Sequence, residues 1–238
     1  MEVPTQTVWF GDGREQEVLH HIFNLPRLEQ LRGRPEAILA EIDNWSQKNK
    51  ILMTIGQERG SIITNLIVNT KPKVMAELGG YIGYSAIKFG SAVRNSGGTR
   101  YLSFEQNVEW ASIATKLIGL AGLQDFVTIV PGSSSESLMI FGSQQPVPQI
   151  DILFLDHAET LYRRDLGICE QLGLITSGAY VVADNVSGPR TRDYVAWVMQ
   201  GDKNERSFEA ENKIYDSYMS SHTLPNGETD GMIVSRYK

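Results

Sequence analysis

The hydrophobic positions follow a helical pattern over the first 70 residues and a strand-like pattern after them. In the first part, apolar side chains recur three or four positions apart, which predicts helices over residues 15–25, 35–45 and 61–69. Residues 26–34 are polar and contain several turn formers, so we expect a loop between the first two helices.

From residue 73 onward, short apolar runs alternate with helical stretches. The runs predict strands at 74–76, 101–104, 126–130, 150–155 and 179–183. Helical patterns follow these runs, at 85–93, 108–120, 135–141, 162–174 and 191–199. A repeat of roughly 25 to 30 residues is the size of a strand-plus-helix unit, so we expect an α/β fold with a parallel sheet covered on both faces.

The C-terminal part departs from this repeat. Residues 209–218 and 231–237 have an extended pattern, and the stretch between them contains the turn dipeptide Asn226-Gly227. We therefore predict a seven-stranded, mostly parallel sheet that ends in an antiparallel hairpin. We expect a single domain over residues 1–238, with residues 1–70 as a helical cap and 71–238 as the sheet core.

The composition excludes several classes of protein. The chain has 238 residues, a formal net charge of −6 and one cysteine, Cys169, which cannot form an internal disulfide. We find no signal peptide pattern and no apolar run near the roughly 20 residues that span a bilayer. The net negative charge is unsuited to binding the phosphate backbone of a nucleic acid. We expect a cytoplasmic protein that binds neither nucleic acid nor membranes; the oligomeric state stays open, and a monomer is compatible with the sequence.

Polar residues follow the predicted strands, where ligands bind in open parallel sheets. The first strand runs into a turn with Gly79, Gly80 and Gly83, whose spacing is not the G-x-G-x-x-G of nicotinamide binders. The second strand ends in Glu105, and an acid at this place can accept hydrogen bonds from both ribose hydroxyls. A plain tight turn and a solvated glutamate are the alternatives, but the two features together favour a nucleoside site.

The fourth and fifth strands end in acidic pairs, Asp156-His157 and Asp184-Asn185. Neighbouring strands would bring Asp156, Asp184 and Asn185 together, and three hard oxygen donors suit Mg²⁺ or a similar divalent ion. The alternative is that one acid caps a helix and the other faces solvent. His157 is either a capping or core histidine or a contact to the cofactor.

Several segments resemble the catechol O-methyltransferases, over about residues 11 to 237; they are 11–16, 53–56, 77–86, 132–135, 154–157 and 183–186. The resemblance implies a Rossmann-like fold that binds S-adenosylmethionine (SAM), a Mg²⁺ ion on the three residues named above, and a small-molecule acceptor. The implied SAM site consists of Met53, Ile55, Glu77, Gly79, Tyr81, Ser85, Glu105, Gln106, Ser134, Ser135, Asp156 and His157. Within it, Glu105 would hold the ribose, and Gln106, Ser134 and Ser135 would surround the adenine. Pro189 would form an apolar gate for the acceptor, and Asp216 falls near the family's acidic clamp.

One position departs from the family pattern. The family places Trp-Lys after the Asp-His pair, with the lysine as general base, whereas this chain has Ala158 and Glu159. Glu159 is then the candidate catalytic group, as a proton acceptor or as a further metal ligand.

We predict a SAM-dependent, divalent-metal-dependent O-methyltransferase that acts on a small catechol-like or hydroxylated aromatic metabolite. The alternative is a methyltransferase-like protein that keeps SAM and metal binding but acts as a cyclase, a lyase or a binding protein. A nicotinamide dehydrogenase shares the sheet architecture, and the glycine spacing argues against it.

Overall fold

The sheet forms the centre of the molecule. The computed structural model describes residues 10–200, 214–223 and 229–238. Seven strands pair in the order β3-β2-β1-β4-β5-β7-β6. Their bounds are β1 Val74–Leu78, β2 Arg100–Glu105, β3 Val127–Pro131, β4 Ile152–Leu155, β5 Tyr180–Ala183, β6 Tyr215–Thr223 and β7 Thr229–Tyr237. The first five are parallel and β7 pairs antiparallel with β5 and β6, which confirms the predicted sheet.

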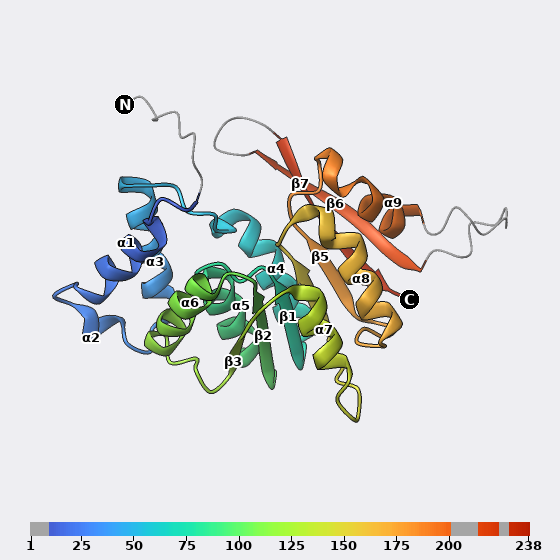
Figure 1. The fold of residues 1–238 in the computed structure, drawn as a ribbon, viewed down its shortest axis with the longest axis horizontal. Helices are drawn as coiled ribbons and strands as arrows, with labels where there is room; N and C mark the ends of the chain where they lie inside the picture. The colour runs from blue at the N-terminus through green and yellow to red at the C-terminus, as the bar shows by residue number, and fades with distance from the viewer. Residues whose placement is uncertain (1–9, 201–213, 224–228) are drawn as a thin grey trace.

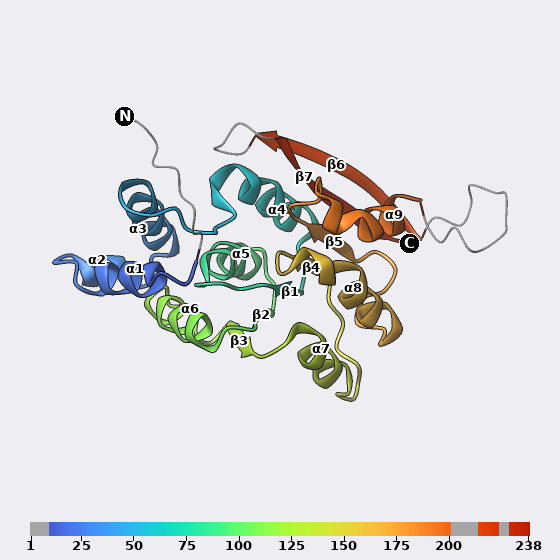
Figure 2. The ribbon, with the colours of Figure 1, turned by 45° about the horizontal axis from the view of Figure 1, so that its top comes forward.

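Helices cover both faces of this sheet, as Figures 1 and 2 show. Helices α4 and α5 lie on one side, with α6, α1 and α3 beyond them, and α7, α8 and α9 lie on the other. Their bounds are α1 Arg14–Phe23, α2 Leu28–Leu31, α3 Pro35–Lys48, α4 Gly56–Thr70, α5 Tyr84–Asn95, α6 Val108–Leu120, α7 Ser134–Gly142, α8 Tyr162–Gln171 and α9 Arg192–Gln200. Two short 3₁₀ turns, η1 Glu159–Leu161 and η2 Pro189–Thr191, follow β4 and β5.

The central strands are buried on both faces because each face carries its own hydrophobic core. Phe154 of β4 packs edge-on against Phe89 of α5, with ring centroids 5.7 Å apart. Its neighbours Leu153 and Leu155 point into the core beneath α7, α8 and α9. This two-sided burial explains the continuous apolar runs in the sequence. Because both cores are built on one sheet, we propose that the chain is a single domain with residues 1–70 as its cap.

The structure corrects three boundaries. The loop expected at 26–34 contains the short helix α2, a single turn that places Leu31 in the core. Helix α4 begins at Gly56 rather than at residue 61, because its first turn is polar and gave no apolar period. Strand β6 runs to Thr223, beyond the expected end at 218, while residues 209–213 of the predicted strand lie outside the described residues. Within the described ranges, no helix is long and apolar enough to cross a bilayer.

Candidate functional site

The glycine turn after β1 brings the ends of β1 and β4 into close contact. Gly79 has φ +95°, and a Cβ atom there would lie 2.3 Å from the carbonyl oxygen of Asp156 and 2.8 Å from the amide nitrogen of His157. A glycine is therefore required at this turn, both for its left-handed backbone and for the space that it leaves. The turn presents its backbone at the carboxyl edge of the sheet, as the sequence predicted.

Glu105 is held against this turn. Its side chain is buried at the end of β2, where its carboxylate oxygens accept hydrogen bonds from the amides of Tyr81 and Asn107, both at 2.7 Å. Burial raises the pKa of Glu105, and these backbone donors act in the opposite direction by favouring the ionised form. The result is a fixed carboxylate beside the glycine turn, in the place that a ribose would require.

Glu77 lies beneath the turn, fully buried in β1. Its two carboxylate oxygens accept hydrogen bonds from Ser103 Oγ at 2.6 Å and from the Tyr101 hydroxyl at 2.7 Å. A further hydrogen bond links it to Ser85. Glu77 thus ties β1 to β2 and to the start of α5, directly under the predicted SAM site. Burial raises its pKa to about 7.

This buried acid should make stability depend on pH. Glu77 has an ordinary pKa of 4.5 in the unfolded chain and about 7 in the folded protein. Between these values the folded protein keeps a proton that the unfolded chain loses, so raising the pH lowers the free energy of unfolding by roughly 2 to 3 kcal/mol. Glu77→Gln mimics the protonated form and lacks this pH dependence. In urea unfolding, the free energy of unfolding of the variant minus that of the wild type should therefore rise by roughly 2 to 3 kcal/mol between pH 5 and pH 8. A difference that stays constant with pH would contradict the prediction.

The N-terminal cap reaches the same turn. The hydroxyl of Tyr81 donates a hydrogen bond to Glu15 of α1 at 2.8 Å, and its ring packs edge-on against Trp110 of α6 at 4.9 Å between centroids. Of the two predicted methionine-side residues before α4, Ile55 is buried in the core and Met53 is 39% exposed. Met53 therefore has the more accessible side chain of the two.

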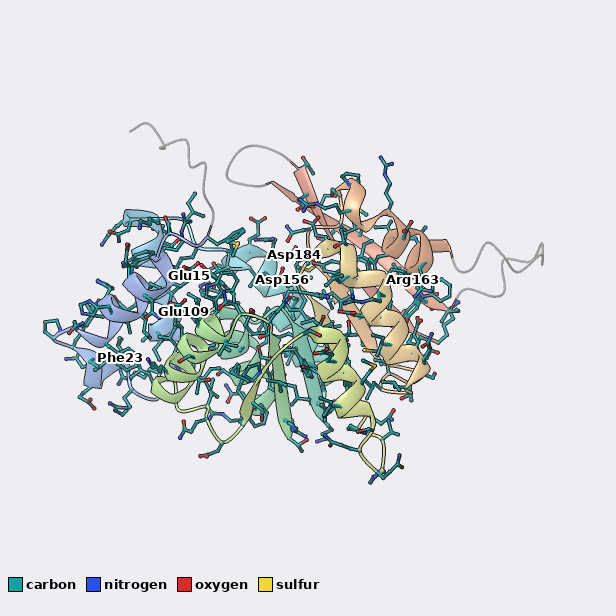
Figure 3. The ribbon with its side chains drawn as sticks, viewed as in Figure 1. Glu15, Phe23, Glu109, Asp156, Arg163 and Asp184 are labelled. Atoms are coloured by element: carbon teal, nitrogen blue, oxygen red, sulfur yellow. The ribbon has the colours of Figure 1, made fainter. Side chains whose placement is uncertain are left out.

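Two acidic side chains meet at the ends of β4 and β5. Figure 3 shows Asp156 and Asp184 next to each other at one edge of the sheet. Asp184 is only 1% exposed, whereas Asp156 keeps part of its surface open. Desolvation, and then the negative charge of Asp184, raise the pKa of Asp156 well above its ordinary value. Such a pair is destabilising on its own and favours a bound cation.

Asn185 completes the predicted metal ligands. It has φ +55°, and its side-chain nitrogen donates a hydrogen bond to Asp230 Oδ2 at 2.8 Å. The amide nitrogen is thereby engaged, which leaves the amide oxygen as the group of this side chain that can bind a cation. Two carboxylates and one amide oxygen suit a hard divalent ion. Within the described ranges, no group of three or more His, Cys, Asp and Glu side chains could hold a metal; the set proposed here contains two such side chains, Asp156 and Asp184, and an amide.

A basic side chain shares the acidic pair. Arg59, in the first turn of α4, forms an ion pair with Asp184 through Nη1, and its Nη2 donates to the carbonyl oxygen of Thr54 at 3.3 Å. The guanidinium offsets part of the negative charge, and its charge lowers the pKa of Asp156. A divalent ion bound here would therefore share Asp184 with Arg59.

Glu159 lies on the turn after β4 and faces the turn after β5. Its carboxylate forms an ion pair with Arg190, 3.0 Å from Nε, and the side chains of Glu159 and Arg190 are 25% and 70% exposed. Pro189, the predicted gate, is exposed and directly precedes Arg190. The two 3₁₀ turns are thus joined by an ion pair near the outer side of the acidic site.

The predicted clamp residue Asp216 lies elsewhere, so that prediction was wrong. Asp216 of β6 lies opposite Arg236 of β7, which in turn lies opposite Tyr180 at the start of β5. Asp184 follows the other end of β5, so Asp216 and Asp184 lie at opposite edges of the sheet. Asp216 is 69% exposed and forms an ion pair with Lys238 at 3.2 Å. The acid that lies beside Asn185 is instead Asp230.

Three further predicted residues gather around a buried acid on α8. Ser134, Ser135 and His157 all hydrogen-bond to Asp165, which is fully buried. Gln106, predicted around the adenine together with Ser134 and Ser135, follows Glu105 and is exposed. The structure therefore brings together the predicted residues at the ends of β1, β2, β4 and β5. Sequence analysis missed Arg59, Asp165 and Asp230.

Comparisons with known proteins agree with this fold. A family model described as O-methyltransferase matches residues 32–199. Catechol O-methyltransferase of Bos taurus is 31% identical over 224 residues, which cover 94% of this chain and 78% of that protein. The protein of the same name from Mus musculus is 30% identical over 227 residues, 95% and 81% of the two chains. The solved O-methyltransferase from Bacillus cereus in complex with SAH has a TM-score of 0.68 at 19% identity, covering 95% and 97% of the two chains, which confirms the Rossmann-like fold.

Proposed function

This chain belongs to the O-methyltransferase family, and on that basis we propose that it transfers a methyl group from SAM to a hydroxyl group of a small catechol-like or hydroxylated aromatic metabolite. We propose that the reaction depends on Mg²⁺ or another hard divalent ion. The relatives named catechol O-methyltransferase support the acceptor class. The observation that carries the proposal is the meeting of Asp156 and Asp184 at the edge of the sheet that also holds the glycine turn and Glu105.

The chain offers distinct groups to each part of SAM. Glu105 would accept hydrogen bonds from the ribose hydroxyls, since its carboxylate is already fixed at the turn. We propose Met53, Ile55, Tyr81 and Ser85 around the methionine part, above Glu77 and Gly79. We propose Gln106, Ser134 and Ser135 around the adenine. Asp156 and His157 would complete the pocket, with His157 on the adenine side because Asp165 joins it to the two serines. SAM supplies an activated methyl group, and the protein's part is to align the acceptor oxygen with it.

Asp156, Asp184 and Asn185 would hold the divalent ion. When bound, such an ion lowers the pKa of an acceptor hydroxyl and orients it. The chain's own contribution is to hold these ligands rigidly: Asp230 fixes the Asn185 amide, and Arg59 fixes Asp184. Pro189 would line the acceptor side of the site.

Glu159 would accept the proton of the acceptor hydroxyl in place of the family's lysine. Arg190 forms an exposed ion pair with its carboxylate. We expect Glu159→Gln, which keeps the shape but cannot accept the proton, to lower kcat by about 10²-fold. The KM for SAM should stay unchanged, because Glu159 is assigned to the acceptor and not to the cofactor.

Arg190→Gln is the matched control for this prediction, since it removes the guanidinium that pairs with Glu159 and keeps the Glu159 carboxylate. We expect it to lower kcat by less than about tenfold, because an exposed ion pair orients its partners only weakly. Steady-state kinetics of both variants with the same acceptor provide the comparison. If Glu159→Gln were as active as the wild type, Glu159 would have no role in proton transfer.

Methyl transfer from radiolabelled SAM to a panel of catechols and hydroxylated aromatics tests the proposed function. We expect a labelled product that EDTA abolishes and that Mg²⁺ or Mn²⁺ restores. A panel without any product in the presence of either ion would reject methyl transfer, and a product unaffected by EDTA would reject only the metal dependence. The comparisons do not support the alternative of a cyclase, a lyase or a binding protein.

We propose a cytoplasmic setting for this chain. The acidic composition and the single cysteine favour a cytoplasmic protein whose partner is a small molecule rather than nucleic acid or a membrane. Gel filtration of the purified chain would determine its oligomeric state, which the sequence leaves open.

A further inference from the structure

Asp165 is a buried carboxylate that receives donors from several segments. It lies in the first turn of α8 and is fully buried. Its Oδ2 faces Ser134 Oγ at 2.5 Å and His157 Nε2 at 2.9 Å. Its Oδ1 faces Ser135 Oγ at 2.9 Å and Arg164 Nε at 2.8 Å. Ser134 and Ser135 begin α7 and His157 follows β4, so this one carboxylate joins parts of the chain that are far apart in sequence.

These contacts determine which way each hydrogen bond points. An ionised carboxylate only accepts, so both serine hydroxyls donate their single proton to Asp165. In a neutral His157, the ring proton is on Nε2 for the same reason, and Nδ1 is left as an acceptor. The hydroxyl oxygens and Nδ1 can then only accept hydrogen bonds from any other group. We call Ser134, Ser135 and His157 the acceptor trio.

The acceptor trio is suited to a ligand that donates. The His157 side chain is 10% exposed, and its Nδ1 is buried without a hydrogen-bond partner in the part of the chain that the structure describes. A buried acceptor without a partner loses hydrogen-bond energy that a bound donor would restore. Both serines keep part of their surface exposed.

We infer that Asp165, through the acceptor trio, sets the nucleobase specificity of the cofactor site. This inference rests on the proposed function, which places the trio around the base of SAM. A surface of acceptors binds the 6-amino group of adenine, which donates, and repels the 6-oxo group of hypoxanthine, which accepts. Asp165 itself contacts no ligand in this scheme and is a positioning residue.

The variant Asp165→Asn should reverse this polarity. Arg164 Nε always donates, so the oxygen of the new amide faces Arg164 and its NH₂ group faces Ser134 and His157. His157 Nε2 then has to accept a hydrogen bond from this NH₂ group, which moves the ring proton to Nδ1. The Ser134 hydroxyl also accepts from the NH₂ group, so its own proton is free to be donated to another group. The acceptor trio gains outward donors, while the shape of the cluster is nearly unchanged.

Calorimetric titration of the full chain with S-adenosylhomocysteine and with its 6-oxo analogue, S-inosylhomocysteine, tests the inference. The wild type should bind the adenine ligand about 10 to 100 times more tightly, which is the usual cost of a mismatched buried hydrogen bond. In Asp165→Asn this ratio should fall to about one or invert.

Arg164→Gln is the matched control, because Arg164 contacts the same carboxylate but is not in the acceptor trio; its ratio should remain that of the wild type. Equal losses of affinity for both ligands in Asp165→Asn would show a merely structural role. A wild type that binds both ligands equally overturns the inference without any variant, even if Asp165→Asn fails to fold. If the wild type bound neither ligand, the proposed function would fail as well.

Discussion

Asp156→Asn should lower kcat for methyl transfer at least about 10³-fold while the protein remains folded. The substitution keeps the shape of the side chain and removes one of the two carboxylates proposed to hold the divalent ion. A bound ion contributes several kcal/mol of charge stabilisation, and each 1.4 kcal/mol corresponds to a factor of ten in rate. Because the charge of Asp184 already disfavours a second ionised carboxylate at Asp156, the neutral variant should not be destabilised.

The same variant should lose divalent-ion binding, which gives a measurement independent of turnover. Calorimetric titration with Mn²⁺ should show that Asp156→Asn binds the ion with an affinity at least about tenfold below that of the wild type. Asp216→Asn is the matched control, because Asp216 is exposed and lies on β6 at the level of the start of β5, away from Asp156. It should change neither kcat nor the affinity for Mn²⁺ by more than about twofold. Full activity in Asp156→Asn, or a large loss in Asp216→Asn, would contradict the site as we assign it.

The sheet was predictable because its physical signal is local. Strands buried on both faces must be apolar throughout, and this property is visible over five or six residues without knowledge of the rest of the fold. The carboxyl ends of such strands meet at one edge, so Glu105, Asp156 and Asp184 could be assigned to one site from their positions alone.

The missed residues are those whose roles depend on distant parts of the chain. Arg59 lies in the polar first turn of a helix, and only the packing of α4 against the sheet brings it to Asp184. Asp230 reaches Asn185 through the antiparallel pairing of β7, whose register the sequence did not fix. The wrong assignment of Asp216 has the same cause, since a shift of a few residues along β6 decides which end of the sheet a side chain occupies.

Gly79→Ala should destabilise the protein by about 2 to 5 kcal/mol, the largest effect on stability that we expect of any single substitution discussed here. Two costs combine: the left-handed backbone costs a non-glycine residue about 1 to 2 kcal/mol, and the overpacking of a rigid backbone costs about 1 to 3 kcal/mol or more. The new Cβ would lie 2.3 Å from the carbonyl oxygen of Asp156, and a backbone atom between two paired strands cannot move away as a flexible side chain would.

Gly97→Ala separates these two costs. Gly97 has φ +84°, close to the +95° of Gly79, but nothing lies within 4 Å of the position that its Cβ would occupy. It should therefore cost only about 1 to 2 kcal/mol in the free energy of unfolding, measured by urea denaturation. The difference between the variants measures how closely the ends of β1 and β4 approach, which is also what brings the glycine turn to Asp156. Equal destabilisation would mean that the turn can open, and that the predicted SAM and metal sites are not held together as rigidly as we infer.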